Sequence, residues 1–187
     1  MIPKSVKEQF LNQKAVVIWM TGLSGSGKTT LAKNLQNELF RRGYLSQILD
    51  GDKIRSGINI NLGYSETDRI ENIRRTAEIS KLFLNCGIIC INSFITPANE
   101  MRQIAKNIIG KENLIEIYMS ASLEYCEKLD IKGFYKDARD GKIKNFTGID
   151  APYEIPVNPE IEINSEFLTI KESVQKCMEV IRNRIKY

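Results

Sequence analysis

The stretch Gly22-Leu23-Ser24-Gly25-Ser26-Gly27-Lys28-Thr29-Thr30 follows the apolar run Ala15-Val16-Val17-Ile18-Trp19-Met20 and decides the fold. It matches the pattern GxxxxGK(S/T) of a phosphate-binding loop. Its glycines let the backbone turn so that successive N–H groups point at anionic oxygens. The apolar run predicts a buried strand before the loop, and leucines at 31, 35 and 39 predict one face of a helix after it. The stretch therefore predicts a nucleoside triphosphate site at a strand-to-helix turn.

Two side chains of this loop carry most of its expected chemistry. Lys28 supplies a cation for the β and γ phosphates, and the Thr29 hydroxyl is a ligand for Mg²⁺. We expect ATP to contact the following residues of the loop: Gly22, Ser24, Gly25, Ser26, Gly27, Lys28, Thr29 and Thr30.

Composition limits the class of protein and its partners. The chain has 187 residues, of which 42% are hydrophobic, and this predicts one domain over residues 1–187. The net charge of +4 is mild and spread along the chain, which favours a small anionic partner over nucleic acid. The chain has no histidine, so carboxylates must perform any acid–base catalysis.

Cysteine usage and hydropathy predict the compartment. Cysteines at 86, 90, 126 and 177 lack CxxC spacing, so we interpret them as small core residues in a reducing compartment. No apolar run approaches the length of a membrane span, and the first residues lack the apolar part of a signal peptide. We therefore expect a cytoplasmic protein without a membrane partner.

Strand and helix patterns alternate along the whole chain. This alternation predicts an α/β three-layer sandwich with a mostly parallel sheet and helices on both faces. We expect strands at 15–20, 45–49, 88–92, 114–119 and 160–163, and helices at 4–12, 29–42, 65–85, 98–109, 122–129 and 169–185. Ligands of such sheets bind at the carboxyl ends of the strands.

Two carboxylates lie at such a strand end. Asp50 and Asp52 flank a glycine directly after the second expected strand. One of them can hold hydrated Mg²⁺, and the other can accept a proton from an acceptor hydroxyl. Beyond them, Arg55 and Arg69 are able to clamp an anionic substrate, and Asn72 lies beside Arg69 at a helical spacing of three. The pattern predicts a kinase with an anionic, nucleotide-like acceptor.

The segment 132–159 is too long for a simple connection in a compact domain. It carries several lysines and arginines together with aromatic residues and prolines. We interpret it as a lid that closes over the phosphates and excludes water.

The motifs GLSGSGKTT, LDGDKIRSG, LGYSETDRIENIRR, FITP, KGFYKDAR and IKNFTGIDAPYE stand in the order and spacing of the adenylylsulfate kinase family. The chain resembles this family over roughly residues 15–165. The resemblance implies a P-loop kinase that transfers the γ-phosphoryl group of MgATP to the ribose 3′-hydroxyl of a nucleotide, and a homodimer is typical of the family. It places Asp50 at the metal and Asp52 at the acceptor hydroxyl.

The resemblance also implies which residues contact the acceptor. They are Arg55, Tyr64, Arg69, Asn72, Ile95 and the lid residue Lys144. By the same resemblance, the lid residue Arg139 is expected at the ATP site. Thr96 takes the place of a family serine that has been assigned a phosphorylated intermediate. Direct in-line transfer from ATP needs no such nucleophile, so we expect no covalent intermediate.

Several positions depart from the usual family pattern. Ala98 and Asn99 replace a tyrosine and an arginine, and Leu129 replaces another arginine. Fewer cations then face the anionic tail, and the chain looks most like a divergent branch associated with capsule genes. That resemblance favours cytidine diphosphoramidate as acceptor, in capsule phosphoramidate biosynthesis. The alternative is an adenylylsulfate kinase, which makes 3′-phosphoadenylylsulfate in sulfate activation.

Two other classes of protein fit the sequence less well. A GTPase needs a guanine-binding NKxD motif, and the dipeptide Asn-Lys does not occur in the chain. A nucleotide-gated regulatory module is plausible only without the catalytic carboxylates, and both are present.

Overall fold

The computed structural model describes residues 2–187 and contains a five-stranded sheet in the order β2-β3-β1-β4-β5. All pairings between these strands are parallel, which confirms the expected α/β class and sharpens "mostly parallel" to fully parallel. The strands are β1 (Val17–Gly22), β2 (Ser46–Asp50), β3 (Ile89–Ser93), β4 (Leu114–Met119) and β5 (Ile161–Ile163).

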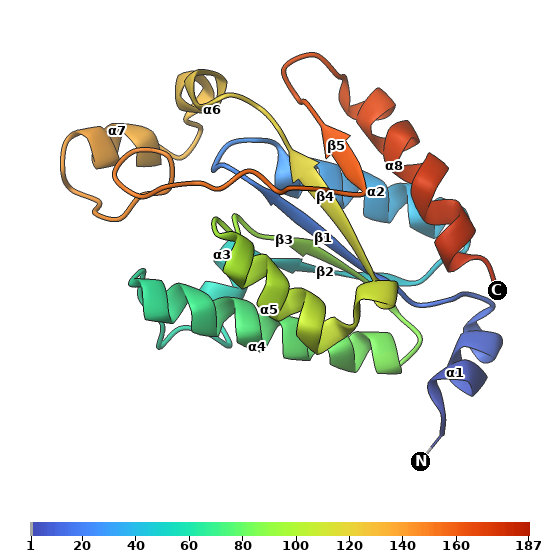
Figure 1. Cartoon of the computed structure of the whole chain (residues 1–187). Helices are drawn as coiled ribbons and strands as arrows, with labels where there is room; N and C mark the ends of the chain where they lie inside the picture. The colour runs from blue at the N-terminus through green and yellow to red at the C-terminus, as the bar shows by residue number, and fades with distance from the viewer. Residues whose placement is uncertain (1) are drawn as a thin grey trace.

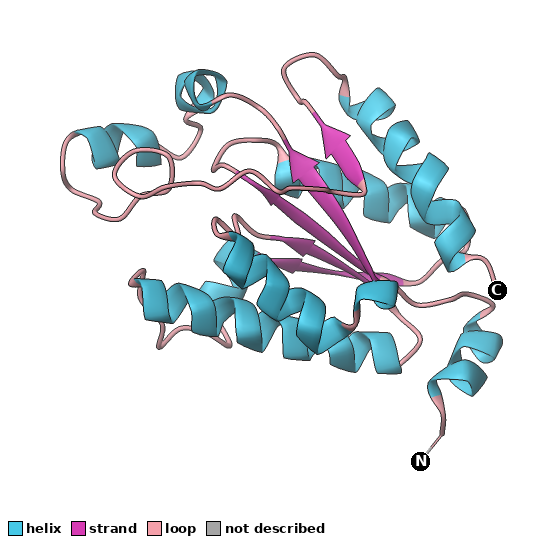
Figure 2. Ribbon diagram, viewed as in Figure 1, coloured by secondary structure: helices cyan, strands magenta, loops and turns pink. Residues whose placement is uncertain are grey.

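Helices cover both faces of the sheet (Figures 1 and 2). Those of the main body are α1 (Lys4–Leu11), α2 (Lys28–Arg41), α4 (Glu66–Asn85), α5 (Asn99–Ile109) and α8 (Ile170–Ile185). Shorter ones are α3 (Gly51–Arg55), η1 (Lys111–Asn113), α6 (Leu123–Leu129) and α7 (Phe134–Arg139). In Figure 1, α6 and α7 lie beyond the arrowheads of β1 and β4.

Side-chain alternation along β1 divides the core into two layers. Ile18 and Met20 are fully buried in a cluster with leucines of α2 and apolar residues of α8. Val17 and Trp19 point to the opposite face and pack with residues of α4 and α5. Because β1 is buried on both sides and pairs with β3 and β4, its carboxyl end is held at the centre of the sheet.

The ends of the long helices follow signals in the sequence. Ser65 is the N-cap of α4, and its hydroxyl oxygen accepts a hydrogen bond from the Asp68 N–H at 3.2 Å. At the start of α8, Thr169 and Glu172 form a full capping box, in which each side chain accepts a backbone N–H of the other residue. Gly43 and Gly87, just past α2 and α4, adopt positive φ angles of 84° and 79°.

Two short helices were missed by the sequence analysis. Asp50 begins α3 because its Oδ1 accepts the Asp52 N–H at 3.1 Å. No helix was expected in the segment 132–159, but it contains α7. There the Asp130 carboxylate accepts the N–H groups of Tyr135 and Lys136 at 3.1 and 3.0 Å, which satisfies the free end of the helix.

The structure confirms the interpretation of the cysteines as core residues for three of the four. All four are free thiols, and those at 90, 126 and 177 are buried as expected. Cys86 is exposed at the C-cap of α4, so it is not a core residue. Within residues 2–187, we find no helix with the combination of length and apolarity that a bilayer crossing requires.

Candidate active site

The phosphate-binding loop connects β1 to α2 at the centre of the sheet, where the sequence predicts it. Gly22, Gly25 and Gly27 have φ angles of 148°, 76° and 88°, a region that other residues rarely adopt. A side chain at Gly22 would also place its Cβ only 2.7 Å from the carbonyl oxygen of Met119. Glycine at this position therefore lets the loop pack closely against the end of β4.

Lys28 lies beneath this loop and is held by it. Its Nζ donates to the carbonyl oxygens of Gly22 at 2.9 Å and Leu23 at 2.6 Å, and the residue is 8% exposed. Burial lowers the pKa of Lys28 from 10.5 to about 8. The lysine is thus a weakly solvated cation that can exchange carbonyl contacts for phosphate oxygens.

The predicted metal ligands meet beside the loop. The Thr29 hydroxyl donates to Oδ2 of Asp50 at 2.8 Å. The hydroxyl oxygens of Thr29 and Ser93 are 3.3 Å apart. Within residues 2–187, no group of three or more acidic, cysteine or histidine side chains could hold a metal ion by itself. One carboxylate with a hydroxyl nevertheless fits Mg²⁺, since this ion completes its coordination with water and substrate phosphates.

Asp52 forms an ion pair with Lys132, which precedes α7. The side chains are 67% and 52% exposed, so the pair lies open to solvent at the mouth of the site. The sequence analysis placed Lys132 in the lid segment without a function. Its position at the start of the motif KGFYKDAR was the only hint of a function in the sequence. The fold shows that Lys132 reaches the carboxylate of Asp52.

Three residues predicted to contact the acceptor form a cluster next to Asp52. The guanidinium carbon of Arg55 lies 4.6 Å from the ring centre of Tyr64, and that of Arg69 lies 5.9 Å from it. The Tyr64 carbonyl accepts a hydrogen bond from Nε of Arg69 at 3.0 Å, and Tyr64 is 60% exposed. An exposed aromatic ring between two cations suits a planar, negatively charged ligand.

Arg69 also joins α4 to the lid segment. It donates to the Thr147 hydroxyl at 3.1 Å and to the carbonyl oxygen of Asn145. Lys144 precedes this contact in the chain and is exposed. The structure therefore brings the lid close to the cluster formed by Arg55, Tyr64 and Arg69.

Asn72 and Ile95 are less open than the cluster. Asn72 is 4% exposed, and its Oδ1 accepts a hydrogen bond from Asn59 at 2.9 Å. Ile95 is half-buried after β3, and its carbonyl oxygen accepts from the Gly22 N–H at 3.3 Å and the Thr21 hydroxyl at 2.6 Å. These bonds tie the phosphate-binding loop to the turn that carries Ile95.

Thr96 does not present its hydroxyl to this site. The residue is 1% exposed, and Oγ1 accepts a hydrogen bond from Nε1 of Trp19 at 3.0 Å. Its φ angle of 43° is unusual for a β-branched residue, and Arg102 holds its carbonyl oxygen at 2.6 Å. A catalytic function of the hydroxyl therefore does not fit the geometry.

The remaining residues expected at ATP are spread over the loop and α7. The Ser24 carbonyl accepts from the Tyr135 hydroxyl at 2.8 Å, which anchors α7 to the loop. Arg139 does not reach the loop in this conformation. It makes a bidentate ion pair with Glu127 of α6, at 2.9 and 3.0 Å.

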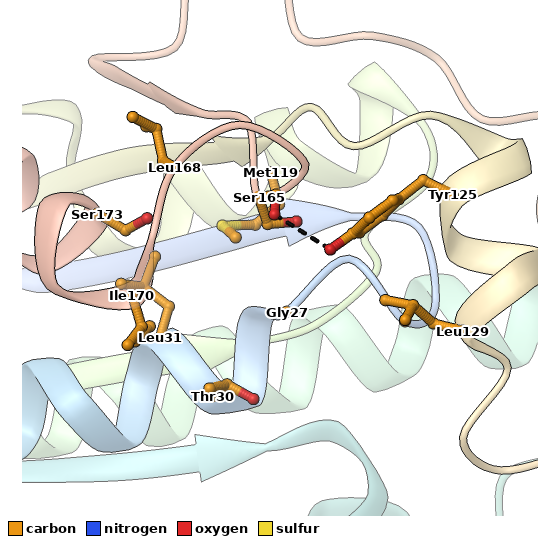
Figure 3. A pocket seen from close by; sticks show the side chains of 11 residues that line it. Gly27, Thr30, Leu31, Met119, Tyr125, Leu129, Ser165, Leu168, Ile170 and Ser173 are labelled. Atoms are coloured by element: carbon orange, nitrogen blue, oxygen red, sulfur yellow. Dashed lines mark hydrogen bonds between the residues drawn. The ribbon is translucent and has the colours of Figure 1, made fainter.

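A cavity of about 160 Å³ opens beside Gly25 and Gly27 (Figure 3). Tyr125 points across it, and its hydroxyl donates to the Ser165 carbonyl at 3.2 Å. Its other lining residues are Thr30, Leu31, Met119, Leu129, Leu168, Ile170 and Ser173. Apart from Thr30, none of them was expected at a nucleotide. Leu129, Leu168, Ile170 and Ser173 come from segments after β4 and β5, which meet the loop only in the fold.

Known proteins share both the sequence and the fold. The family "Adenylylsulphate kinase" matches residues 14–164. An adenylyl-sulfate kinase of Bacteroides thetaiotaomicron is 54% identical over 186 residues, which are 100% of this chain and 92% of the relative. Adenylyl-sulfate kinase 3 of Arabidopsis thaliana is 51% identical over 96% of this chain and 86% of its own length.

A solved structure of the same family superposes closely on this one. It is the APS kinase of Mycobacterium tuberculosis in complex with AMPPNP and APS, with a TM-score of 0.87 and 36% identity. The match covers 90% of this chain and 98% of the other. The chain therefore belongs to the adenylylsulphate kinase family, and it is a kinase that phosphorylates a nucleotide 3′-hydroxyl.

Proposed function

We propose that the protein is an adenylylsulfate kinase, which transfers the γ-phosphoryl group of ATP to the 3′-hydroxyl of adenosine 5′-phosphosulfate. The observation that carries this proposal is the identity of 54% over the whole chain with a relative of that name. Further relatives from Bacteroides fragilis and Phocaeicola vulgatus, at 52% and 55% identity, bear the same name. The comparisons thus favour the alternative acceptor over cytidine diphosphoramidate, and they give no support to a function in capsule biosynthesis.

The sequence departures at 98 and 99 are also compatible with adenylylsulfate. Asn99 is used in packing, since its Oδ1 accepts from Arg102 at 2.7 Å and its N–H donates to Glu154 at 2.6 Å. Ala98 is the N-cap of α5. Arg55 and Arg69 keep two cations beside Tyr64, which supports binding of an anionic tail without the replaced arginine.

ATP is proposed to bind along the phosphate-binding loop. The backbone of the loop, from Gly22 to Thr30, would surround the phosphates, and Lys28 would contact the β and γ groups. The base would enter the cavity beside Gly27, which Tyr125 partly closes (Figure 3). Thr29 and Asp50 would hold Mg²⁺, whose chemistry is to neutralise charge on the phosphates.

The acceptor is proposed to bind on the other side of the loop. Its base would stack on Tyr64, and Arg55 and Arg69 would hold its anionic groups. Asn72, Ile95 and Lys144 would complete the contacts. The ribose would then lie toward Asp52.

Asp52 is the proposed base for the acceptor hydroxyl. Its carboxylate would accept the 3′-hydroxyl proton while the oxygen attacks the γ-phosphorus in line. Lys132, already paired with Asp52, would stabilise charge on the transferred group together with Lys28. No step of this mechanism needs a protein nucleophile.

Residues 1–187 are proposed to act as a single kinase domain, with a lid at about 132–159. Contacts of Arg69 with this segment, and of Tyr135 with the loop, support closure over both substrates. Assembly of two copies into a homodimer stays a prediction from the family.

Replacing Thr96 by valine is expected to leave at least about a tenth of the wild-type kcat, because the hydroxyl faces Trp19. Valine preserves the shape but loses the hydrogen bond, so a drop in Tm of a few degrees is expected. Initial rates and thermal unfolding measure both effects. Complete loss of transfer with ATP still bound would instead support a phosphorylated intermediate.

The affinity for MgATP is expected to fall above about pH 8. Burial lowers the pKa of Lys28 to about 8 in the free protein, whereas bound phosphates favour the ammonium form and raise it. The Kd should therefore rise by about tenfold per pH unit above that value. Titration calorimetry with MgATP at several pH values measures this slope.

The matched control for this slope is Lys28→Arg, because a guanidinium stays charged throughout this range. The Kd of this variant for MgATP should not rise with pH in the same way. A flat profile in the wild-type protein would show that the charge of Lys28 is not lost.

The position of phosphorylation tests the proposed function. Incubation with MgATP and adenosine 5′-phosphosulfate should yield ADP and a product whose new phosphate couples to the ribose 3′ proton in ³¹P nuclear magnetic resonance. Phosphate on another oxygen, or release of inorganic phosphate alone, would contradict the proposal.

A further inference from the structure

Asn59 is a buried polar residue that the proposed mechanism does not use. It is fully buried in the loop between α3, which carries Asp52, and α4, which carries Asn72. Its Nδ2 donates to Oδ1 of Asn72 at 2.9 Å. This bond connects the loop that follows α3 to α4.

The backbone on both sides fixes the position of Asn59. Its N–H donates to the Ile54 carbonyl at 2.9 Å, and its own carbonyl accepts from the Leu62 N–H at 3.0 Å. Its side-chain Oδ1 is buried and has no hydrogen-bond partner within residues 2–187. A buried oxygen without a partner costs free energy, whereas the Nδ2 donor of the same amide is satisfied by its bond to Asn72.

The effect of this bond falls on the amide of Asn72. With Oδ1 of Asn72 occupied, its Nδ2 is the remaining polar atom of the side chain. No bond from this Nδ2 is found in the described part of the chain, and it is not among the fully buried atoms without a partner. It is therefore an accessible donor. The opposite orientation would present an oxygen to an anionic ligand.

We propose that Asn59 is a positioning residue, which holds the amide of Asn72 so that Nδ2 donates to an oxygen of the nucleotide acceptor. Asn59 itself does not touch the substrate. The inference rests on the proposed function, because it assumes that Asn72 faces the acceptor. It makes the orientation of one amide a determinant of acceptor affinity.

Asn59→Asp tests this inference with almost no change in volume. Once ionised, at a pH above its pKa, the new carboxylate can only accept hydrogen bonds, so Asn72 must turn its Nδ2 inward and present Oδ1 to the acceptor. The KM for the acceptor should rise at least tenfold, while the KM for ATP stays within twofold and kcat within threefold of wild type. An acceptor KM within twofold of wild type, or equal rises for both substrates, would overturn the inference.

The matched control is Asn61→Asp in the same loop. Asn61 also bonds to α4, through Arg75 at 2.9 Å, but it is exposed and its bond does not involve Asn72. The same chemical change there should leave both KM values unaltered. A rise in acceptor KM equal to that of Asn59→Asp would show a general effect of added charge and overturn the inference.

A double-mutant cycle separates positioning from loss of structure. In an Asn72→Ala background, Asn59→Asp should not raise the acceptor KM further, since no amide is left to orient. If the two substitutions instead raised the acceptor KM by the product of their separate effects, the inference would be contradicted. If Asn59→Asp fails to bind ATP, Asn59→Ser takes its place, and a threefold to tenfold rise in acceptor KM is then expected.

Failure of the proposed function can be told apart from failure of this inference. Wild-type enzyme that is inactive with adenosine 5′-phosphosulfate but active with cytidine diphosphoramidate would refute the proposed acceptor alone. The same variants are then compared with the cytidine compound, and the same KM pattern decides the function of Asn59.

Discussion

Lys28→Ala is expected to lower kcat for phosphoryl transfer by at least about a hundredfold to a thousandfold. The ammonium group is held at the phosphate-binding loop by its hydrogen bonds to the carbonyl oxygens of Gly22 and Leu23. Because the charge on the phosphoryl oxygens must be stabilised most strongly in the transition state, the loss should appear in kcat as well as in binding. Coupled release of ADP measures the effect.

Lys33→Ala is the matched control for this change. Lys33 is exposed on the same helix, so the two variants remove the same side chain from α2. The control should retain wild-type kcat. Unchanged turnover in Lys28→Ala would contradict the assignment of the loop as the ATP site.

Asp52→Asn is expected to lower kcat by about a hundredfold to ten-thousandfold while changing the KM for the acceptor little. The amide keeps the size of the carboxylate but cannot accept the proton of the 3′-hydroxyl. The carboxylate is exposed, and its partner Lys132 is exposed as well, so its loss should not unfold the protein. Steady-state kinetics with both substrates separates kcat from KM.

Asp140→Asn provides the control, because Asp140 is also an exposed aspartate paired with a lysine, Lys142, at 3.2 Å. It should retain full activity. A rise in KM alone for Asp52→Asn would reassign Asp52 to substrate binding. Equal losses in Asp52→Asn and Lys132→Met, with no further loss in the double variant, would indicate that Asp52 acts by holding Lys132.

The sheet was predictable because its signals are local. An apolar run followed by GLSGSGKTT specifies a buried strand, a turn and a helix, and the other strands repeat this logic with Gly43 and Gly87 as helix ends. The helices α3 and α7 were missed because their ends depend on aspartate side chains. Asp50 and Asp130 each accept nearby backbone N–H groups, and apolar periodicity does not indicate such bonds.

The candidate site was predictable where residues follow strands directly. Thr29 and Asp50 were expected at one edge of a parallel sheet, and their oxygens are 2.8 Å apart. Contacts between distant segments were not predictable from the residues. The pairing of Lys132 with Asp52 spans 80 positions, and the burial of Thr96 depends on Trp19, 77 positions away.

The choice of acceptor was the least predictable part. Ala98, Asn99 and Leu129 differ from the usual family pattern and suggested a weaker anion site. In the structure, Asn99 bonds to Arg102, and Leu129 lines the cavity at the phosphate-binding loop. Their surroundings are visible only once the segments are folded together, so the sequence alone does not give their effect on the acceptor.

The most direct measurement of the central claim compares two acceptors under identical conditions. ADP release is followed with MgATP and either adenosine 5′-phosphosulfate or cytidine diphosphoramidate, and kcat/KM is determined for each. We predict a preference of about a hundredfold or more for adenosine 5′-phosphosulfate, which corresponds to about 2.7 kcal/mol of differential transition-state binding. A comparable preference for the cytidine compound would contradict the proposed function.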